Sequence, residues 1–158
     1  MSADYITAFV DGAARNQGSP NPTEAACAFA VYKAKREMAH FVRGLGSITN
    51  NAAEYHALID CLLYCSALSL PFPIIYTDSL IVHNQVNHIW NCNDENLLPL
   101  YMTVMEIQEV YNFKLVHVSR KQTFIPDGLC NAFLDKLALA KKKLKPRYRP
   151  KKVETNAE

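Results

Sequence analysis

The sequence lacks several features that would define a class of protein at once. It has no apolar run of about 18 residues and no basic N-terminal segment followed by an apolar one, so it shows no membrane span and no signal peptide. Its five cysteines form no C-x-x-C pair, unlike a zinc site or a secreted disulfide framework, and most are expected to be reduced core residues. We therefore expect a soluble intracellular protein, cytoplasmic or nuclear.

Basic residues are also absent from a long central section. No Lys or Arg occurs between Arg43 and Lys114, so the side chains of that section cannot form ion pairs with a polyanion. Residues 1–140 contain nine Lys and Arg against 13 Asp and Glu, whereas residues 141–158 contain eight against two. An acidic body thus precedes a basic segment, of which residues 144–158 are expected to be a disordered tail. Such a segment either attracts phosphates by counterion release or only solvates the terminus, and both readings stay open.

The apolar pattern predicts one α/β domain over residues 1–143. A chain of 158 residues, 49% of them hydrophobic, is long enough for one core and too short for two. The segment 12–24 has turn chemistry throughout. In the helix expected over residues 95–111, Leu98, Met102, Met105 and Val110 should face inward. Strands are expected at residues 5–11, 25–33, 37–45, 74–78 and 113–118, and helices at 52–68, 79–88, 95–111 and 126–143.

Four acidic residues stand where these elements begin or end. Asp11 and Asp78 each close a short apolar strand, and in open α/β sheets ligands bind outside the carboxyl ends of the strands. Glu54 projects from the apolar side of a helix near its start, where a buried carboxylate needs a cation, a metal or a set of donors. The alternative is that Glu54 reaches water or exposed backbone N–H groups there. Asp127 opens the last helix, where capping is the simpler reading.

Four short motifs in chain order carry a family resemblance. The sequence has Asp11-Gly12-Ala13, T-N-N-x-x-E over residues 49–54, T-D-S over residues 77–79 and D-x-x-x-N over residues 127–131. Together, over about residues 4–140, they resemble the type 1 ribonuclease H family. The resemblance implies an RNase H-like three-layer fold, in which a five-stranded mixed sheet has helices on both faces.

The resemblance also implies a metal-dependent reaction. By it, Asp11, Glu54, Asp78 and Asp127 bind two divalent ions, with Mg²⁺ expected and Mn²⁺ as a substitute. Hard ions take oxygen ligands, and no His/Cys cluster in the sequence would select zinc. In a two-ion site one ion activates a water and the other stabilises the leaving 3′ oxygen. The implied activity is that of an endoribonuclease, which hydrolyses the RNA strand of RNA/DNA hybrids to 5′-phosphate and 3′-hydroxyl products.

Substrate contacts follow from the same resemblance. Thr49 is similar to the family's DNA-phosphate contact, and five further residues are similar to its minor-groove contacts: Gly12, Ala13, Asn16, Asn50 and Asn51. The register of Asn16 is open, because residues 16–21 depart from the common G-N-P-G-P turn. Asn50 and Asn51 have capping of the helix as a second reading.

His117 and Arg120 are candidates of a different kind. They stand in an H-V-S-R sequence that resembles the family's H-V-P-R variant. His117 either assists proton transfer or product release there, or only ends a strand. Thr123, Pro126 and Leu80 depart from the residues usual in the family, which puts fine substrate contacts in doubt and leaves the carboxylates untouched.

The expected partner is an RNA/DNA hybrid, with no membrane or protein partner indicated and a monomer expected. The family's basic protrusion is missing, because residues 79–112 contain no Lys or Arg. We also expect no N-terminal hybrid-binding domain of the kind that some members of the family have. We hypothesise that residues 141–152 supply the missing attraction for the duplex.

Two alternative interpretations of the whole chain remain. One is the ribonuclease H domain of a reverse transcriptase or mobile element, although the chain ends close to the motif limits favour a free-standing protein. The other is a non-catalytic nucleic-acid-binding module, which has no reason to keep four costly carboxylates.

Overall fold

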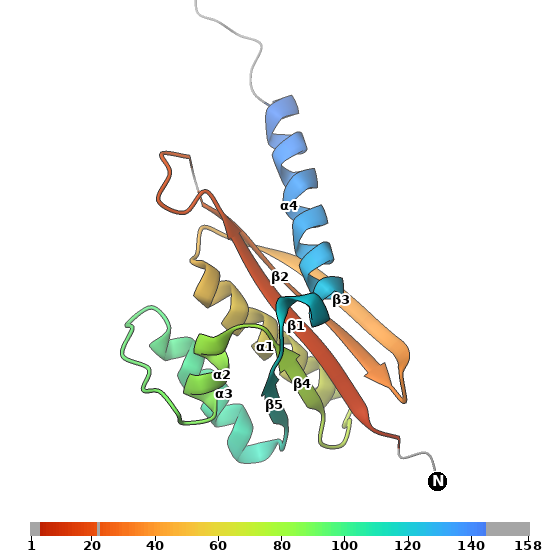
Figure 1. Ribbon diagram of the computed structural model, residues 1–158. Coiled ribbons are helices and arrows are strands. Elements are labelled where there is room, and N and C mark those ends of the chain that lie inside the picture. Colours follow the sequence, from red (N-terminus) through yellow and green to blue (C-terminus); the bar gives the residue numbers. More distant parts are fainter. Residues whose placement is uncertain (1–3, 22, 145–158) are drawn as a thin grey trace, which may run out of the picture.

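A five-stranded mixed sheet forms the centre of the computed structural model, which describes residues 4–21 and 23–144 (Figure 1). The strand order is β3-β2-β1-β4-β5. The first three strands form an antiparallel meander, and β4 and β5 run parallel to β1. The strands are β1 (Ile6–Arg15), β2 (Glu24–Lys33), β3 (Arg36–Gly46), β4 (Ile74–Thr77) and β5 (Lys114–His117).

Helices cover both faces of this sheet. In Figure 1, α1, α2 and α3 lie below and to the left of β1, where they share the main core, and α4 lies above it with a core cluster of its own. The helices are α1 (Asn50–Ala67), α2 (Leu80–Val86), α3 (Leu98–Val110) and α4 (Phe124–Leu144), and the short 3-10 helix η1 (Arg120–Gln122) joins β5 to α4. The three-layer α/β fold is therefore confirmed. Between residues 4 and 144, with residue 22 left aside, no helix has the length and apolar character needed to cross a membrane.

The main core lies between the sheet and α1. Alternate residues of β1 (Ile6, Ala8, Val10) are buried against Leu58 and Leu62 of α1. Burial of each large aliphatic side chain contributes about 1.5–3 kcal/mol, so this layer fixes α1 on the sheet. A second, smaller cluster joins α4 to β2 through Ala26, Ala28, Cys130 and Leu134, where small strand residues let the helix approach. All five cysteines are free and four are buried, as expected.

β1 is longer than the sequence suggested. Its pairing with β2 continues through Asp11 to Arg15, so the turn expected at Gly12 is wrong and Asp11 lies inside the strand. A Cβ on Gly12 would lie 2.2 Å from the carbonyl carbon of Ala53 in α1. The glycine therefore permits close packing of a strand against a helix, and does not make a turn.

α3 turns a different side to the core than the one expected. Leu98, Met102 and Val110 are 43%, 48% and 86% exposed, while Val104 is fully buried. Of the four predicted inward residues only Met105 packs against the core. The prediction failed because apolar residues occur on nearly every side of this helix, which leaves no clear stripe. The expected tail, residues 145–158, lies outside the described residues, and Leu144 ends α4.

Candidate metal centre

Two adjacent parallel strands bring Asp11 and Asp78 together. β1 and β4 pair in register with Val10 beside Thr77, and the two aspartates are the next residues in each chain segment. Asp78 follows the last residue of β4, and Ser79 then caps α2. The expected meeting of the two carboxylates is confirmed, although Asp11 reaches it from within a strand.

Glu54 reaches the same place from α1. Thr49 caps this helix, because its Oγ1 accepts a hydrogen bond from the N–H of Ala52 at 3.2 Å. Glu54 follows in the second turn, and its Oε2 accepts a hydrogen bond from the N–H of Gly12 at 3.0 Å. Glu54 is only 6% exposed, and the backbone N–H that it meets belongs to β1 and not to the start of its own helix.

The three carboxylates form a cluster that fits a cation. One oxygen from each of Asp11, Glu54 and Asp78 lies within 4.8 Å of the others. Among the described residues, no group hydrogen-bonds the buried Oδ2 of Asp11, and a buried anionic oxygen without a partner is costly. A hard divalent ion with oxygen ligands suits this set of donors.

The electrostatics of the cluster lead to the same conclusion. Burial, together with the charges of Asp78 and Asp127, raises the pKa of Asp11 to about 7. Burial and the neighbouring Asp11 raise the pKa of Glu54 well above its ordinary range. Both shifts reflect charge that the protein cannot solvate, and a bound cation would offset them.

Asp127 does not belong to this group of three. It lies in the first turn of α4, and its Oδ1 accepts a hydrogen bond from Nη2 of Arg120 at 3.1 Å. Its backbone carbonyl accepts a hydrogen bond from the Asn131 amide at 3.0 Å, so the D-x-x-x-N motif makes a contact within the helix. Asp127 is still near enough to raise the pKa of Asp11. Three of the four predicted carboxylates therefore converge, and the fourth stands beside them in an ion pair.

An open cleft of about 550 Å³ runs over Glu54 and Asp78. Four of the predicted substrate or catalytic residues also line it: Asn50, Asn51, His117 and Arg120. His117 ends β5, and its Nε2 lies 3.2 Å from the carbonyl oxygen of Asp78, a contact that requires the proton on Nε2. The ring of His83 lies 5.9 Å from that of His117, so α2 adds a second histidine that the motifs did not indicate.

The remaining predicted residues connect α1 to the end of β1. Asn50 Oδ1 accepts a hydrogen bond from the N–H of Ala14 at 3.2 Å. Ala13 is half-buried beside this contact in β1. Asn16 begins the following turn with a φ of 63°, and its carbonyl accepts a hydrogen bond from the N–H of Ser19.

Arg15 is a structural residue that sequence reasoning missed. Its Nη1 lies 2.6 Å from Oδ1 of Asp135, and its Nη2 donates to Oδ1 of Asn131 at 3.1 Å. These contacts hold α4 against the end of β1, and thereby place Asp127 near the cluster. No local pattern indicates a pairing between residues 120 positions apart.

Comparisons with known proteins agree with this geometry. A family profile described as "Reverse transcriptase-like" matches residues 10–132. Ribonuclease HI from Halobacterium salinarum is 30% identical over 132 residues, which cover 82% of this chain and 64% of that relative. The chain thus spans a little under two thirds of the length of this curated relative.

Solved structures share the fold. RNase H1 from Halobacterium salinarum superposes with a TM-score of 0.76 at 28% identity, covering 84% of this chain and 98% of that one. The N-terminal RNase H domain of a Mycobacterium tuberculosis protein gives a TM-score of 0.77 at 25% identity, covering 87% and 99%. The sheet, its helices and the acidic cluster define a protein of the RNase H-like class. The chain belongs to the reverse transcriptase-like family, and within it to the type 1 ribonucleases H.

Proposed function

We propose that this chain is a divalent-metal-dependent endoribonuclease that hydrolyses the RNA strand of RNA/DNA hybrids. The products are 5′-phosphate and 3′-hydroxyl ends. The observation that carries this proposal is the convergence of Asp11, Glu54 and Asp78, with a buried carboxylate oxygen left unpaired. The name of the Halobacterium salinarum relative, ribonuclease HI, supports the same activity.

The carboxylate cluster is proposed to hold Mg²⁺, with Mn²⁺ as a substitute. Asp127 would complete a two-ion site if its carboxylate exchanged the ion pair with Arg120 for a metal ion. When bound, the ions supply an activated water and stabilise the leaving 3′ oxygen. The chain itself contributes orientation, because the N–H of Gly12 fixes Glu54 and the β1–β4 register fixes the two aspartates.

His117 and Arg120 are proposed to act at the cleft. The Nε2–H of His117 is directed to the carbonyl of Asp78, which leaves Nδ1 to accept or deliver a proton. Arg120 is 76% exposed in its side chain and lines the cleft, so it can meet a phosphate.

Recognition of RNA is assigned to neutral groups around the start of α1. The amide nitrogens of Asn50 and Asn51, with Ala13 and Asn16 of the β1 end, are suited to the 2′-hydroxyl, which both donates and accepts hydrogen bonds. Thr49 is the proposed contact to a DNA phosphate. The N–H of Gly12 is already engaged by Glu54, so Gly12 would contribute through the close packing that it permits.

A cleavage assay on a fluorogenic RNA/DNA hybrid tests the proposal. We expect cleavage with Mg²⁺ or Mn²⁺, none with EDTA, and none in the Asp78→Asn variant with either ion. Asp4→Asn is the matched control, because Asp4 pairs with the exposed Lys33 and should leave activity unchanged.

Duplex RNA, duplex DNA and single-stranded RNA complete the comparison and should resist cleavage. Cleavage of duplex DNA in preference to the hybrid would contradict the substrate assignment. Hybrid binding without cleavage in either metal would instead indicate a non-catalytic module.

A further inference from the structure

An aromatic surface lies on the same face of the sheet as the metal cluster. In β1, Thr7, Phe9 and Asp11 alternate with the residues buried against α1, so all three project from the face that α4 only partly covers. Tyr76 of β4 stands two residues before Asp78, as Phe9 stands two residues before Asp11 in β1. Because residues i and i+2 of a strand lie about 7 Å apart, Phe9 and Tyr76 form the row next to the two carboxylates.

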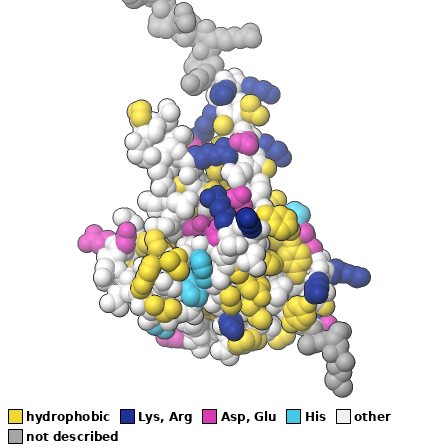
Figure 2. All heavy atoms as spheres, viewed as in Figure 1, with side chains coloured by type: hydrophobic (Ala, Val, Ile, Leu, Met, Phe, Trp, Pro, Cys, Tyr) yellow, Lys and Arg dark blue, Asp and Glu magenta, His cyan; other side chains and the backbone are white. Residues whose placement is uncertain are grey.

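The rings on this surface pack into a continuous platform. Phe9 and Tyr76 are stacked, with centroids 5.0 Å apart and planes inclined by 23°. Tyr32 of β2 meets Phe9 edge-on at 6.0 Å. With Tyr5, which is 41% exposed, these rings line an open pocket of about 420 Å³. Figure 2 shows an apolar area below the start of α4 that Lys and Arg side chains border.

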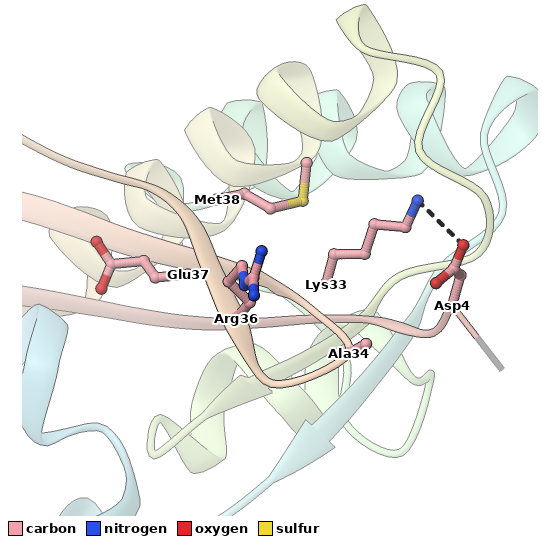
Figure 3. Close-up of a pocket in the computed structure, with 6 residues that line it drawn as sticks. All are labelled: Asp4, Lys33, Ala34, Arg36, Glu37 and Met38. Carbon is pink, nitrogen blue, oxygen red and sulfur yellow. Dashed lines mark ion pairs between the residues drawn. The ribbon is translucent and has the colours of Figure 1, made fainter. Parts of the chain in front are cut away.

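One cation, Lys35, lines this pocket, and the carboxylate of Glu37 lies near the hydroxyl of Tyr32 on another side of it. The lining itself also includes Gln122 and no acidic residue. Lys35 stands at the tip of the β2–β3 hairpin with a φ of 67°, and in the described part of the chain it joins no ion pair. Figure 3 shows the same hairpin, where Lys33 is already paired with Asp4 at 3.2 Å. Lys35 is therefore the hairpin lysine available to an anion in the pocket.

The pocket and the metal cleft lie on either side of the short helix η1. Arg120 lines the cleft and Gln122 lines the pocket, and both belong to η1. A polynucleotide strand that leaves the cleft over η1 would reach the platform directly.

We propose that this platform binds unpaired nucleotides of a strand that extends beyond the hybrid. A base stacks on the platform at Tyr76, which Phe9 supports from its other side, and Lys35 meets a phosphate. Aromatic rings beside a cation are the usual means of holding single strands, because every base has a π-face. The seven lining residues are far fewer than the roughly 20–30 that each side of a stable protein interface uses, which favours a nucleotide over a protein partner. Stacking does not read the sugar, so DNA and RNA extensions are equivalent here.

Binding in EDTA tests this site apart from the nuclease activity. Fluorescence anisotropy compares a blunt RNA/DNA hybrid with the same hybrid carrying a thymidine extension at one end or the other. We expect one extension to tighten binding about tenfold. An extension of abasic residues, which keeps the phosphates, should retain only a small part of that gain.

Variants on the platform complete the test. Tyr76→Ala should abolish the gain, Tyr76→Phe should retain it, and Lys35→Gln should reduce it without disturbing the aromatic packing. Phe41→Ala is the matched control, because Phe41 is a 52% exposed aromatic that stacks on Phe29 instead. Thermal melts confirm that each variant is folded.

Three results would overturn the proposal. The first is an equal affinity for blunt and extended hybrids in the unaltered protein. The second is an undiminished gain in both Tyr76→Ala and Lys35→Gln. The third is a concentration-dependent dimer that Tyr76→Ala dissociates, which would assign the platform to a second copy of the chain.

Discussion

The backbone N–H of Gly12 donates to Oε2 of Glu54 across 3.0 Å, where β1 and α1 come into direct contact. The contact is possible because residue 12 has no side chain, since a Cβ would lie 2.2 Å from the Ala53 carbonyl carbon. One glycine therefore sets both the spacing of the helix from the sheet and the direction of the Glu54 carboxylate. The position of the cluster depends on this spacing.

Replacing Gly12 should damage stability and activity together. Gly12→Ala forces β1 and α1 apart, and overpacking of this kind costs about 3 kcal/mol of unfolding free energy. We expect a lower urea midpoint and loss of hybrid cleavage. Gly128→Ala is the control, because a Cβ there meets open space in α4 and should stabilise the fold by up to about 1 kcal/mol. Equal stabilities for the two variants would disprove the close packing.

The stability of the metal-free protein should fall as pH rises from about 4 to about 7. The pKa of Asp11 is about 7 in the folded chain and 3.8 as an ordinary value, so the folded state holds the extra proton throughout this window. The contribution of protonated Asp11 to the free energy of unfolding is therefore fully present below pH 4 and is lost as pH rises through 7. Each unit of difference between the folded and unfolded pKa corresponds to about 1.4 kcal/mol of this free energy. Thermal melts in EDTA measure the trend.

The Asp11→Asn variant supplies the control for this pH dependence. Other carboxylates also titrate, so the informative quantity is the difference in slope between the unaltered chain and the variant. We expect a flatter decline in the variant, and a smaller decline in the unaltered chain when Mg²⁺ is added. Identical slopes in EDTA would show that folding does not raise the pKa of Asp11.

The strands and the metal-binding motifs could be predicted because their information is local. An apolar run that ends in a carboxylate identifies β1 and β4, and a Thr before two Asn identifies the start of α1. The meeting of Asp11 and Asp78 followed from the rule that ligands bind at the carboxyl ends of the strands, and the family resemblance added Glu54 to them. The end of β1 could not be predicted, because Asp11, Gly12 and the two alanines after them are weak strand formers, whereas pairing with β2 continues to Arg15.

Other features depend on contacts that no local pattern contains. Arg15 reaches Asp135 across 120 positions, and the sequence offers no sign of that pair. The ion pair of Asp127 with Arg120 has a different origin. The family resemblance assigns Asp127 to the metal and Arg120 to the substrate, so it indicates no contact between the two side chains.

Loss of Arg120 should make Asp127 more available to a second ion. The ion pair is exposed, so it contributes at most about 1 kcal/mol, which limits the effect to roughly fivefold. We expect Arg120→Gln to lower the Mg²⁺ concentration for half-maximal cleavage at saturating hybrid, while raising KM. Lys121→Gln, the neighbouring change in η1, is the control. An unaltered Mg²⁺ requirement in both Arg120→Gln and Asp127→Asn would remove Asp127 from the metal site.

The C-terminal turn of α4 should contribute to duplex binding through counterion release. Lys142 and Lys143 are exposed there, whereas Lys141 is ion-paired with Glu24. Each phosphate neutralised contributes about 0.9 to the slope of log affinity against log salt, so Lys142→Gln with Lys143→Gln should lower that slope by about one to two.

The paired lysine provides a matched control for this salt dependence. Replacing Lys141 and Glu24 together, each by Gln, removes an ion pair and leaves the net charge unaltered, so the slope should stay the same. Both double variants are titrated by anisotropy on a blunt hybrid across a range of salt. A slope that stays constant in Lys142→Gln with Lys143→Gln would show that duplex attraction arises elsewhere, because substitution of a phosphate-contacting lysine must release fewer counterions.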